Sequence, residues 1–157
     1  MPYRLLIVDD EPDMCRTLEG AFRHQPWEVE SVSGGDEAVR ELARRSVDVA
    51  LLDVNMPDVD GIQVLETVRR RRIQTDIVVL TGYGTIDLAV AAMKLGARDF
   101  VVKPADLLDL VDKVSAIMDQ RHPARNTLAR RLDRYLRCNL ADTSLDLKRI
   151  SGQFGIS

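Results

Sequence analysis

The stretch that decides the fold is residues 47–61, which read VDVALLDVNMPDVDG. Its first six residues form a nearly continuous apolar run, which is typical of a strand buried on both faces of a parallel sheet. Pro57 and Gly61 are turn-forming residues, so the run is followed by a loop. Asp53 is therefore expected at the carboxyl end of a buried strand, at the mouth of the sheet.

Short apolar runs alternate with amphipathic stretches on both sides of this segment. Strands alternating with helices in one unit predict a parallel sheet covered on both faces. We expect an α/β, flavodoxin-like, doubly wound five-stranded sheet of order 2-1-3-4-5, followed by a short C-terminal helical extension. The expected strands are 4–8, 27–32, 47–52, 76–80 and 98–102, and the expected helices are 12–24, 36–44, 61–71, 85–95 and 105–120.

Charge divides the 157 residues into two parts. Residues 1–119 hold 14 Lys and Arg against 22 Asp and Glu, a net charge of −8, whereas residues 120–157 hold 8 against 3, a net charge of +5. Pro123 disfavours a continuous helix across this boundary. We predict a domain at 1–120, a linker at 121–126 and a helical segment at 127–157. The basic segment fits either a nucleic-acid partner or a solvated helix, and charge alone leaves both open.

Composition narrows the class of protein. The chain has no run of about 18 apolar residues and no basic, apolar and small-residue pattern of a signal peptide at its start, so neither a membrane partner nor export is expected. Cys15 and Cys138 are isolated thiols rather than a disulfide framework or a metal pair. These features predict a cytoplasmic protein.

Polar residues follow the apolar runs at the ends of four expected strands. Asp9 and Asp10 follow the first run, Asp53 the third, Thr81 the fourth and Lys103 the fifth. Strands one and three are neighbours in the expected order, and ligands of open α/β sheets bind in the crevice between them. Three carboxylates that meet there repel one another, and Mg²⁺ is the simplest cation to offset this repulsion.

Such a crevice suits phosphoryl transfer. Asp53 could attack phosphorus and form an aspartyl phosphate. Thr81 and Lys103 could contact the phosphoryl oxygens, and the Asn55 backbone carbonyl could bind the metal. Each residue alone has an ordinary alternative as a helix cap, a turn residue or a solvated charge. Those alternatives do not explain why all of them sit at carboxyl ends of strands.

Residues 1–120 resemble the receiver domain of bacterial two-component response regulators. The resemblance rests on four segments in order: Ile7–Pro12, Asp53–Gly61, Leu80–Gly82 and Asp99–Pro104. It implies a switch protein that is not an enzyme, with intrinsic autophosphorylation and autodephosphorylation, that accepts a phosphoryl group from a sensor histidine kinase.

The same resemblance assigns roles to residues of this chain. It implies that Asp53 is the phosphoacceptor, that Asp9 and Asp10 bind Mg²⁺ with Asp53 and the Asn55 carbonyl, and that Thr81 and Lys103 contact the phosphoryl group. Phe100 takes the place of the aromatic switch residue, with plain core packing as its alternative. A homodimer through the fifth strand and its flanking helices is also expected.

The tail resembles the opening of an AraC-like helix-turn-helix domain, through 132–137, 144–151 and 154–157. The helix that would enter the major groove is not in this chain, so DNA is expected as a partner only through a domain incomplete here. A generic helical hairpin is the alternative.

Three other function classes are alternatives to this interpretation. A phosphatase or phosphotransferase of the haloacid-dehalogenase type would carry its nucleophile as Asp-x-Asp after strand one, where this chain has Asp9-Asp10-Glu11. A flavodoxin-like cofactor binder would need phosphate loops rich in Ser, Thr and Gly. A stand-alone receiver with a protein-binding output remains open.

Overall fold

The computed structural model describes residues 2–123 together with Leu132 and Leu136. Residues up to Met118 form one compact unit, which carries the expected site. The expected helix-turn-helix segment, 127–157, lies outside the described residues apart from those two leucines, so that interpretation stays a prediction.

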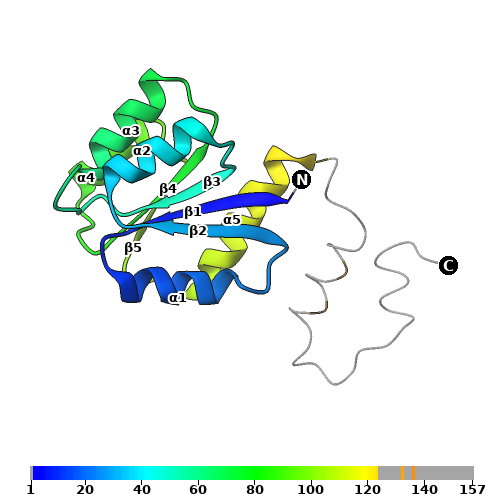
Figure 1. Ribbon diagram of the computed structural model, residues 1–157. Helices are drawn as coiled ribbons and strands as arrows, with labels where there is room; N and C mark the ends of the chain where they lie inside the picture. Colours follow the sequence, from blue (N-terminus) through cyan, green and yellow to red (C-terminus); the bar gives the residue numbers. More distant parts are fainter. Residues whose placement is uncertain (1, 124–131, 133–135, 137–157) are drawn as a thin grey trace. The chain divides into compact units, whose positions relative to one another are not determined.

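The described residues alternate five strands with five helices (Figure 1). All four strand pairs are parallel, and the order is β2-β1-β3-β4-β5, which confirms the predicted fold. The strands are β1 (Tyr3–Val8), β2 (Trp27–Val32), β3 (Val49–Leu52), β4 (Asp76–Thr81) and β5 (Asp99–Val102); the helices are α1 (Pro12–Phe22), α2 (Gly35–Arg44), α3 (Gly61–Arg70), α4 (Ile86–Lys94) and α5 (Leu107–Arg121).

The helices cover both faces of the sheet and create two cores (Figure 1). Helices α2, α3 and α4 pack on one face, through residues such as Leu42, Val64 and Ala92. Helices α1 and α5 pack on the other, through residues such as Phe22 and Val114. Every residue of β3 is buried, because both of its faces meet helices. This burial explains why the sequence of β3 is apolar without alternation.

Two elements begin two residues later than the sequence predicts, and at each of them a nearby carboxylate accepts backbone N–H groups. Strand β3 begins at Val49 rather than at residue 47, and the Asp48 side chain accepts a hydrogen bond from the Arg4 backbone N–H at 2.9 Å. Helix α5 begins at Leu107 rather than at residue 105, because Asp106 accepts hydrogen bonds from two N–H groups of the first turn.

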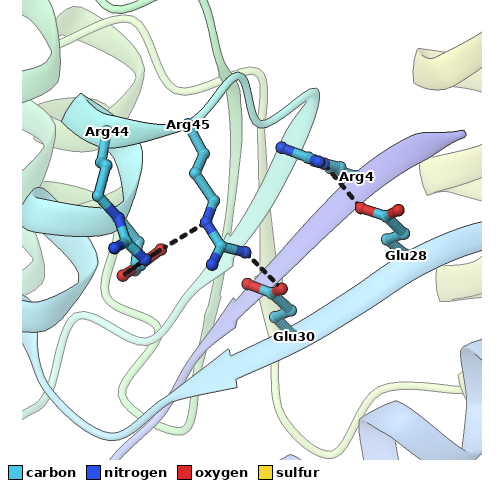
Figure 2. Close-up of polar contacts among 6 residues, drawn as sticks. Arg4, Glu28, Glu30, Arg44 and Arg45 are labelled. Atoms are coloured by element: carbon cyan, nitrogen blue, oxygen red, sulfur yellow. Dashed lines mark hydrogen bonds and ion pairs between the residues drawn. The ribbon is translucent and has the colours of Figure 1, made fainter. Parts of the chain in front are cut away.

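A charged network covers the sheet edge formed by β2 (Figure 2). Arg45 pairs with Glu30 of β2 at 2.6 Å and with Glu41 of α2 at 3.3 Å, while Arg4 of β1 pairs with Glu28 at 2.7 Å. Charges on an edge strand discourage pairing with a further strand. Each such exposed pair contributes little to stability, so the network mainly protects the edge.

In the part of the chain that the structure describes, none of the helices has the length and apolar character needed to cross a membrane.

Candidate functional site

The site is built where β1 and β3 end side by side. Val8 is the register partner of Leu52, and the Asp53 backbone N–H donates to the Val8 carbonyl at 2.9 Å, so Asp9 and Asp53 are brought together. Both side chains are buried, at 2% and 5% exposure, whereas Asp10 is half-buried. Carboxylate oxygens of Asp9, Asp10 and Asp53 lie within 4.8 Å of one another. The predicted acidic cluster is therefore present.

Lys103 extends from the end of β5 into this cluster. Its Nζ lies 2.7 Å from Asp9 Oδ2 and 3.5 Å from Asp53 Oδ2. The Lys103 backbone N–H donates to the Thr81 carbonyl at 2.8 Å, and the following peptide bond to Pro104 is cis. One ammonium group thus offsets part of the charge of two buried carboxylates.

Burial and neighbouring charges have opposing effects on the pKa values of Asp53 and Lys103. Burial raises the pKa of Asp53, although the Asn55 N–H and the Lys103 charge lower it in part, and Asp9 raises it further. Burial alone would lower the pKa of Lys103, but its hydrogen bond to Asp9 and the charges of Asp9 and Asp53 outweigh that effect and raise it. Lys103 is therefore charged at neutral pH, and the site disfavours the charge that Asp53 carries.

The donor set fits Mg²⁺. Hard divalent cations take oxygen ligands, and Mg²⁺ is usually held by one or two carboxylates with waters and phosphate oxygens. The converging carboxylates of Asp9, Asp10 and Asp53 supply such oxygens. Asn55, whose backbone carbonyl is the fourth predicted ligand, belongs to a tight turn in which its N–H donates to Asp53 Oδ1 at 3.0 Å. A second positive charge would also relieve the cost that burial imposes on Asp53.

Thr81 and Phe100 lie on the two strands beyond β3. Thr81 is fully buried at the end of β4, and its hydroxyl oxygen accepts a hydrogen bond from the Tyr83 N–H at 3.2 Å. Phe100 pairs in register with Val79 and is half-buried against the core beneath α2, α3 and α4. Both residues occupy the places that the sequence predicts, and their roles in switching stay predictions.

Asp58 is a structural neighbour of the site that sequence reasoning missed. Its Oδ1 accepts a hydrogen bond from the Gly35 N–H of α2 at 3.4 Å. The Val59 backbone N–H is the main cause that lowers the pKa of Asp58; burial opposes it, and the Gly35 N–H lowers the pKa further. The sequence does hold a signal for it, because Gly34 and Gly35, the N-cap and the first residue of α2, have no side chain that can cap a helix.

Comparison with known proteins identifies the domain. The response regulator receiver domain family matches residues 5–115. The signal receiver domain of a putative Luxo repressor protein from Vibrio parahaemolyticus superposes with a TM-score of 0.74 at 27% identity, covering 76% of this chain and 92% of that one. A CheY-like receiver domain protein from Methanospirillum hungatei superposes with a TM-score of 0.75 at 25% identity, covering 79% and 99%.

Two curated relatives are regulators. The response regulator protein PilR of Pseudomonas aeruginosa is 37% identical over 120 residues, which are 76% of this chain and 27% of PilR. The transcriptional regulatory protein PrrA of Mycobacterium tuberculosis is 36% identical over 118 residues, which are 75% of this chain and 51% of PrrA. The chain thus spans between a quarter and a half of the length of these relatives. With the acidic cluster and the parallel sheet, the match over residues 5–115 shows that the chain belongs to the response regulator receiver domain family.

Proposed function

We propose that the chain is a Mg²⁺-dependent phosphoacceptor that takes a phosphoryl group from a histidine kinase onto Asp53. The observation that carries this proposal is the meeting of Asp9, Asp10 and Asp53 with the Lys103 ammonium group in one crevice. A buried carboxylate with a raised pKa is costly for folding, so a function is the simplest reason for its presence.

In this mechanism an Asp53 carboxylate oxygen attacks phosphorus, the bond from phosphorus to the kinase histidine nitrogen breaks, and that nitrogen keeps the bonding electrons. Asp9, Asp10, Asp53 and the Asn55 carbonyl would hold Mg²⁺, which neutralises charge on the phosphoryl oxygens when bound. Lys103 would exchange part of its contact with Asp9 for a phosphoryl oxygen. The same machinery, with water as the attacking group, would hydrolyse the acyl phosphate and reset the switch.

Thr81 and Phe100 would carry the change outward. The Thr81 oxygen accepts a hydrogen bond from Tyr83, so the hydroxyl hydrogen can still donate to a phosphoryl oxygen. Movement of Thr81 toward that oxygen would open space on the adjoining strand, into which Phe100 could turn. The result is a two-state element biased by a local charge.

A second copy of the chain is the proposed partner of the surface around β5. Large exposed apolar side chains gather there, and two of them, Ile86 on α4 and Leu108 on α5, are 83% and 77% exposed. The other large exposed apolar residues on α4, β5 and α5 are Val90, Met93, Val102 and Leu107. Exposed apolar side chains on neighbouring elements, such as α4 and β5, favour protein association.

The output is proposed to be transcriptional, in the cytoplasm. Support comes from the AraC-like pattern at 127–157 and from the transcriptional role in the name of PrrA. DNA would be bound through a helix-turn-helix domain of this type.

The decisive experiment is incubation with acetyl phosphate and Mg²⁺, followed by intact mass spectrometry. The wild type should gain one phosphoryl group, and the Asp53→Asn variant should gain none. Asp87→Asn, which changes an exposed aspartate of α4 in the same way, should label like the wild type. An unlabelled wild type, or equal labelling of the Asp53 variant, would disprove the phosphoacceptor assignment.

A further inference from the structure

The loop between β3 and α3, residues 53–60, carries both the proposed phosphoacceptor and the proposed carbonyl ligand. The loop is held at each of its ends. At its start the Asp53 carboxylate accepts the Asn55 N–H at 3.0 Å, and at its end Asp60 caps α3 by accepting the Ile62 N–H at 3.0 Å. These contacts are local. Val54 and Met56, on either side of Asn55, are buried in the core, whereas Asp58 in the second half of the loop is exposed and depends on other contacts.

The middle of the loop lies against the start of α2. Asp58 Oδ1 accepts the Gly35 N–H, a bond that joins residues 23 apart in sequence. A Cβ on Gly34 would lie 2.5 Å from Asp58 Oδ2, and a Cβ on Gly35 would lie 2.6 Å from the Val59 Cβ. The two glycines therefore let the loop approach closer than any side chain would allow.

Helix α2 depends on this contact for its cap. Its N-cap residue, Gly34, makes no side-chain capping bond, although the first N–H groups of a helix need acceptors. The Asp58 carboxylate takes that role from another element, and its negative charge is favoured at the positive end of the helix. Backbone N–H groups at the start of α2 are among the causes that lower the pKa of Asp58.

We propose that Asp58 is a positioning residue for the divalent-cation site, because its bond to the start of α2 fixes the loop that presents Asn55. This inference rests on the proposed function, since it takes the Asn55 carbonyl as a metal ligand. The physical reason is that a flexible ligand loses entropy when it binds, whereas a loop already held in place does not. Residues that orient metal ligands typically change metal affinity by about 10–100-fold when they are removed.

The test measures Mg²⁺ affinity of the full chain by calorimetry, without any phosphoryl donor. Asp58→Ala should weaken Mg²⁺ binding about tenfold, at the lower end of that range because Asp58 acts through the backbone. The matched control is Asp36→Ala, which removes an exposed negative charge from the same end of α2 but keeps the Asp36 backbone N–H. The control should bind Mg²⁺ like the wild type, which separates positioning from the general loss of a charge.

A double-mutant cycle sharpens the test. Gly34→Ala alone should also weaken Mg²⁺ binding, because the new methyl group would displace the Asp58 carboxylate. In the Asp58→Ala background the same substitution should have little further effect, because the carboxylate is no longer there. Additive effects of the two substitutions would contradict the proposed contact.

Thermal unfolding completes the design. If Asp58→Ala lowers the Tm but leaves Mg²⁺ affinity and the Mg²⁺ dependence of labelling unchanged, Asp58 is only a helix cap and the inference is overturned. If the wild type binds Mg²⁺ but takes up no phosphoryl group, the proposed function fails, while the calorimetric comparison still decides the role of Asp58.

Discussion

At the scale of single residues, the site places charge where the fold disfavours it. Asp9 and Asp53 are almost fully buried, and one ammonium group, that of Lys103, contacts both. Unpaired or partly paired buried charges cost stability, and ligands that neutralise them recover that cost. The stability of the domain should therefore rise when Mg²⁺ binds or when the charge of Asp53 is removed, and fall when the charge of Lys103 is removed.

Asp53→Asn should raise the Tm in metal-free buffer at pH 7, by about 4–8 °C for each 1 kcal/mol gained in a domain of about 100 residues. Because the pKa of Asp53 is raised in the folded state, the folded chain binds more protons than the unfolded chain above the ordinary aspartate pKa of about 3.9. The contribution of Asp53 to the stability of the wild type therefore falls as the pH rises from about 3.9 through the raised pKa of the folded state.

The advantage of Asp53→Asn should accordingly appear as pH rises above about 4 and disappear below it. Differential scanning fluorimetry of both proteins in a chelator, from pH 3.5 to pH 7, provides the check. A Tm difference between the variant and the wild type that grows toward acidic pH would contradict the predicted direction of this pH dependence.

Removal of the Lys103 charge should have the opposite effect. Lys103→Met leaves Asp9 and Asp53 buried together without their cation, and should cost roughly 2–3 kcal/mol of unfolding free energy in metal-free buffer. Mg²⁺ should restore much of that loss. Urea unfolding with and without Mg²⁺ measures both effects.

The matched control is Lys113→Met, which breaks the ion pair between Lys113 and Asp99. That pair is partly exposed, so its loss should cost less than about 1 kcal/mol and should not depend on Mg²⁺. An equal loss of unfolding free energy in the two variants would show that the buried carboxylates do not depend on the charge of Lys103.

At the scale of elements, the start of α3 shows why a glycine, Gly61, follows the loop at residues 53–60. A Cβ on Gly61 would lie 2.4 Å from the Val54 Cα and 2.7 Å from the Asp53 carbonyl oxygen. These are backbone atoms that cannot turn aside as a flexible side chain can. Helix α3 therefore packs directly against the strand end that carries Asp53, the proposed phosphoacceptor.

Gly61→Ala should destabilise the domain by about 2 kcal/mol, because a methyl group has no room and the backbone must move. The contrasting variant is Gly20→Ala in the last turn of α1, where the nearest atom is the flexible end of Arg23 at 3.7 Å. It should gain about 0.5–1 kcal/mol, because alanine favours the helix. Urea unfolding of both variants measures the change in the free energy of unfolding. A change in the same direction for both variants would refute the packing argument.

At the scale of the whole molecule, the exposed apolar surface around β5 is the feature that a second copy would cover. Ile86→Glu should weaken self-association of the phosphorylated chain about tenfold or more while leaving phosphoryl uptake unchanged, because Ile86 is 83% exposed and lies outside the acidic cluster. Sedimentation velocity in acetyl phosphate and Mg²⁺ measures the association.

Arg40→Glu, on the exposed face of α2, is the control for added negative charge and should associate like the wild type. A wild type that stays monomeric after full labelling, or an Ile86 variant that associates equally well, would remove the dimer from the proposal.

The sequence by itself determined the order of the sheet and the membership of the acidic cluster. In a parallel sheet the carboxyl ends of strands meet at one edge, so residues that follow apolar runs, such as Asp9, Asp53 and Lys103, can be placed together without coordinates. Element ends were less predictable, because contacts between residues distant in sequence help to set them, as the hydrogen bond from the Arg4 backbone N–H to the Asp48 side chain does at β3.

Only the tertiary structure decided how the charges pair and what holds the loop. Lys103 lies closer to Asp9 than to Asp53, although Asp9 is the more distant of the two in sequence. Asp58 caps a helix that begins 23 residues before it. Periodicity reports which face of an element is buried, but it carries no distances between elements. Those distances are set when the two cores pack and the strand ends come together, which places Lys103 against both Asp9 and Asp53.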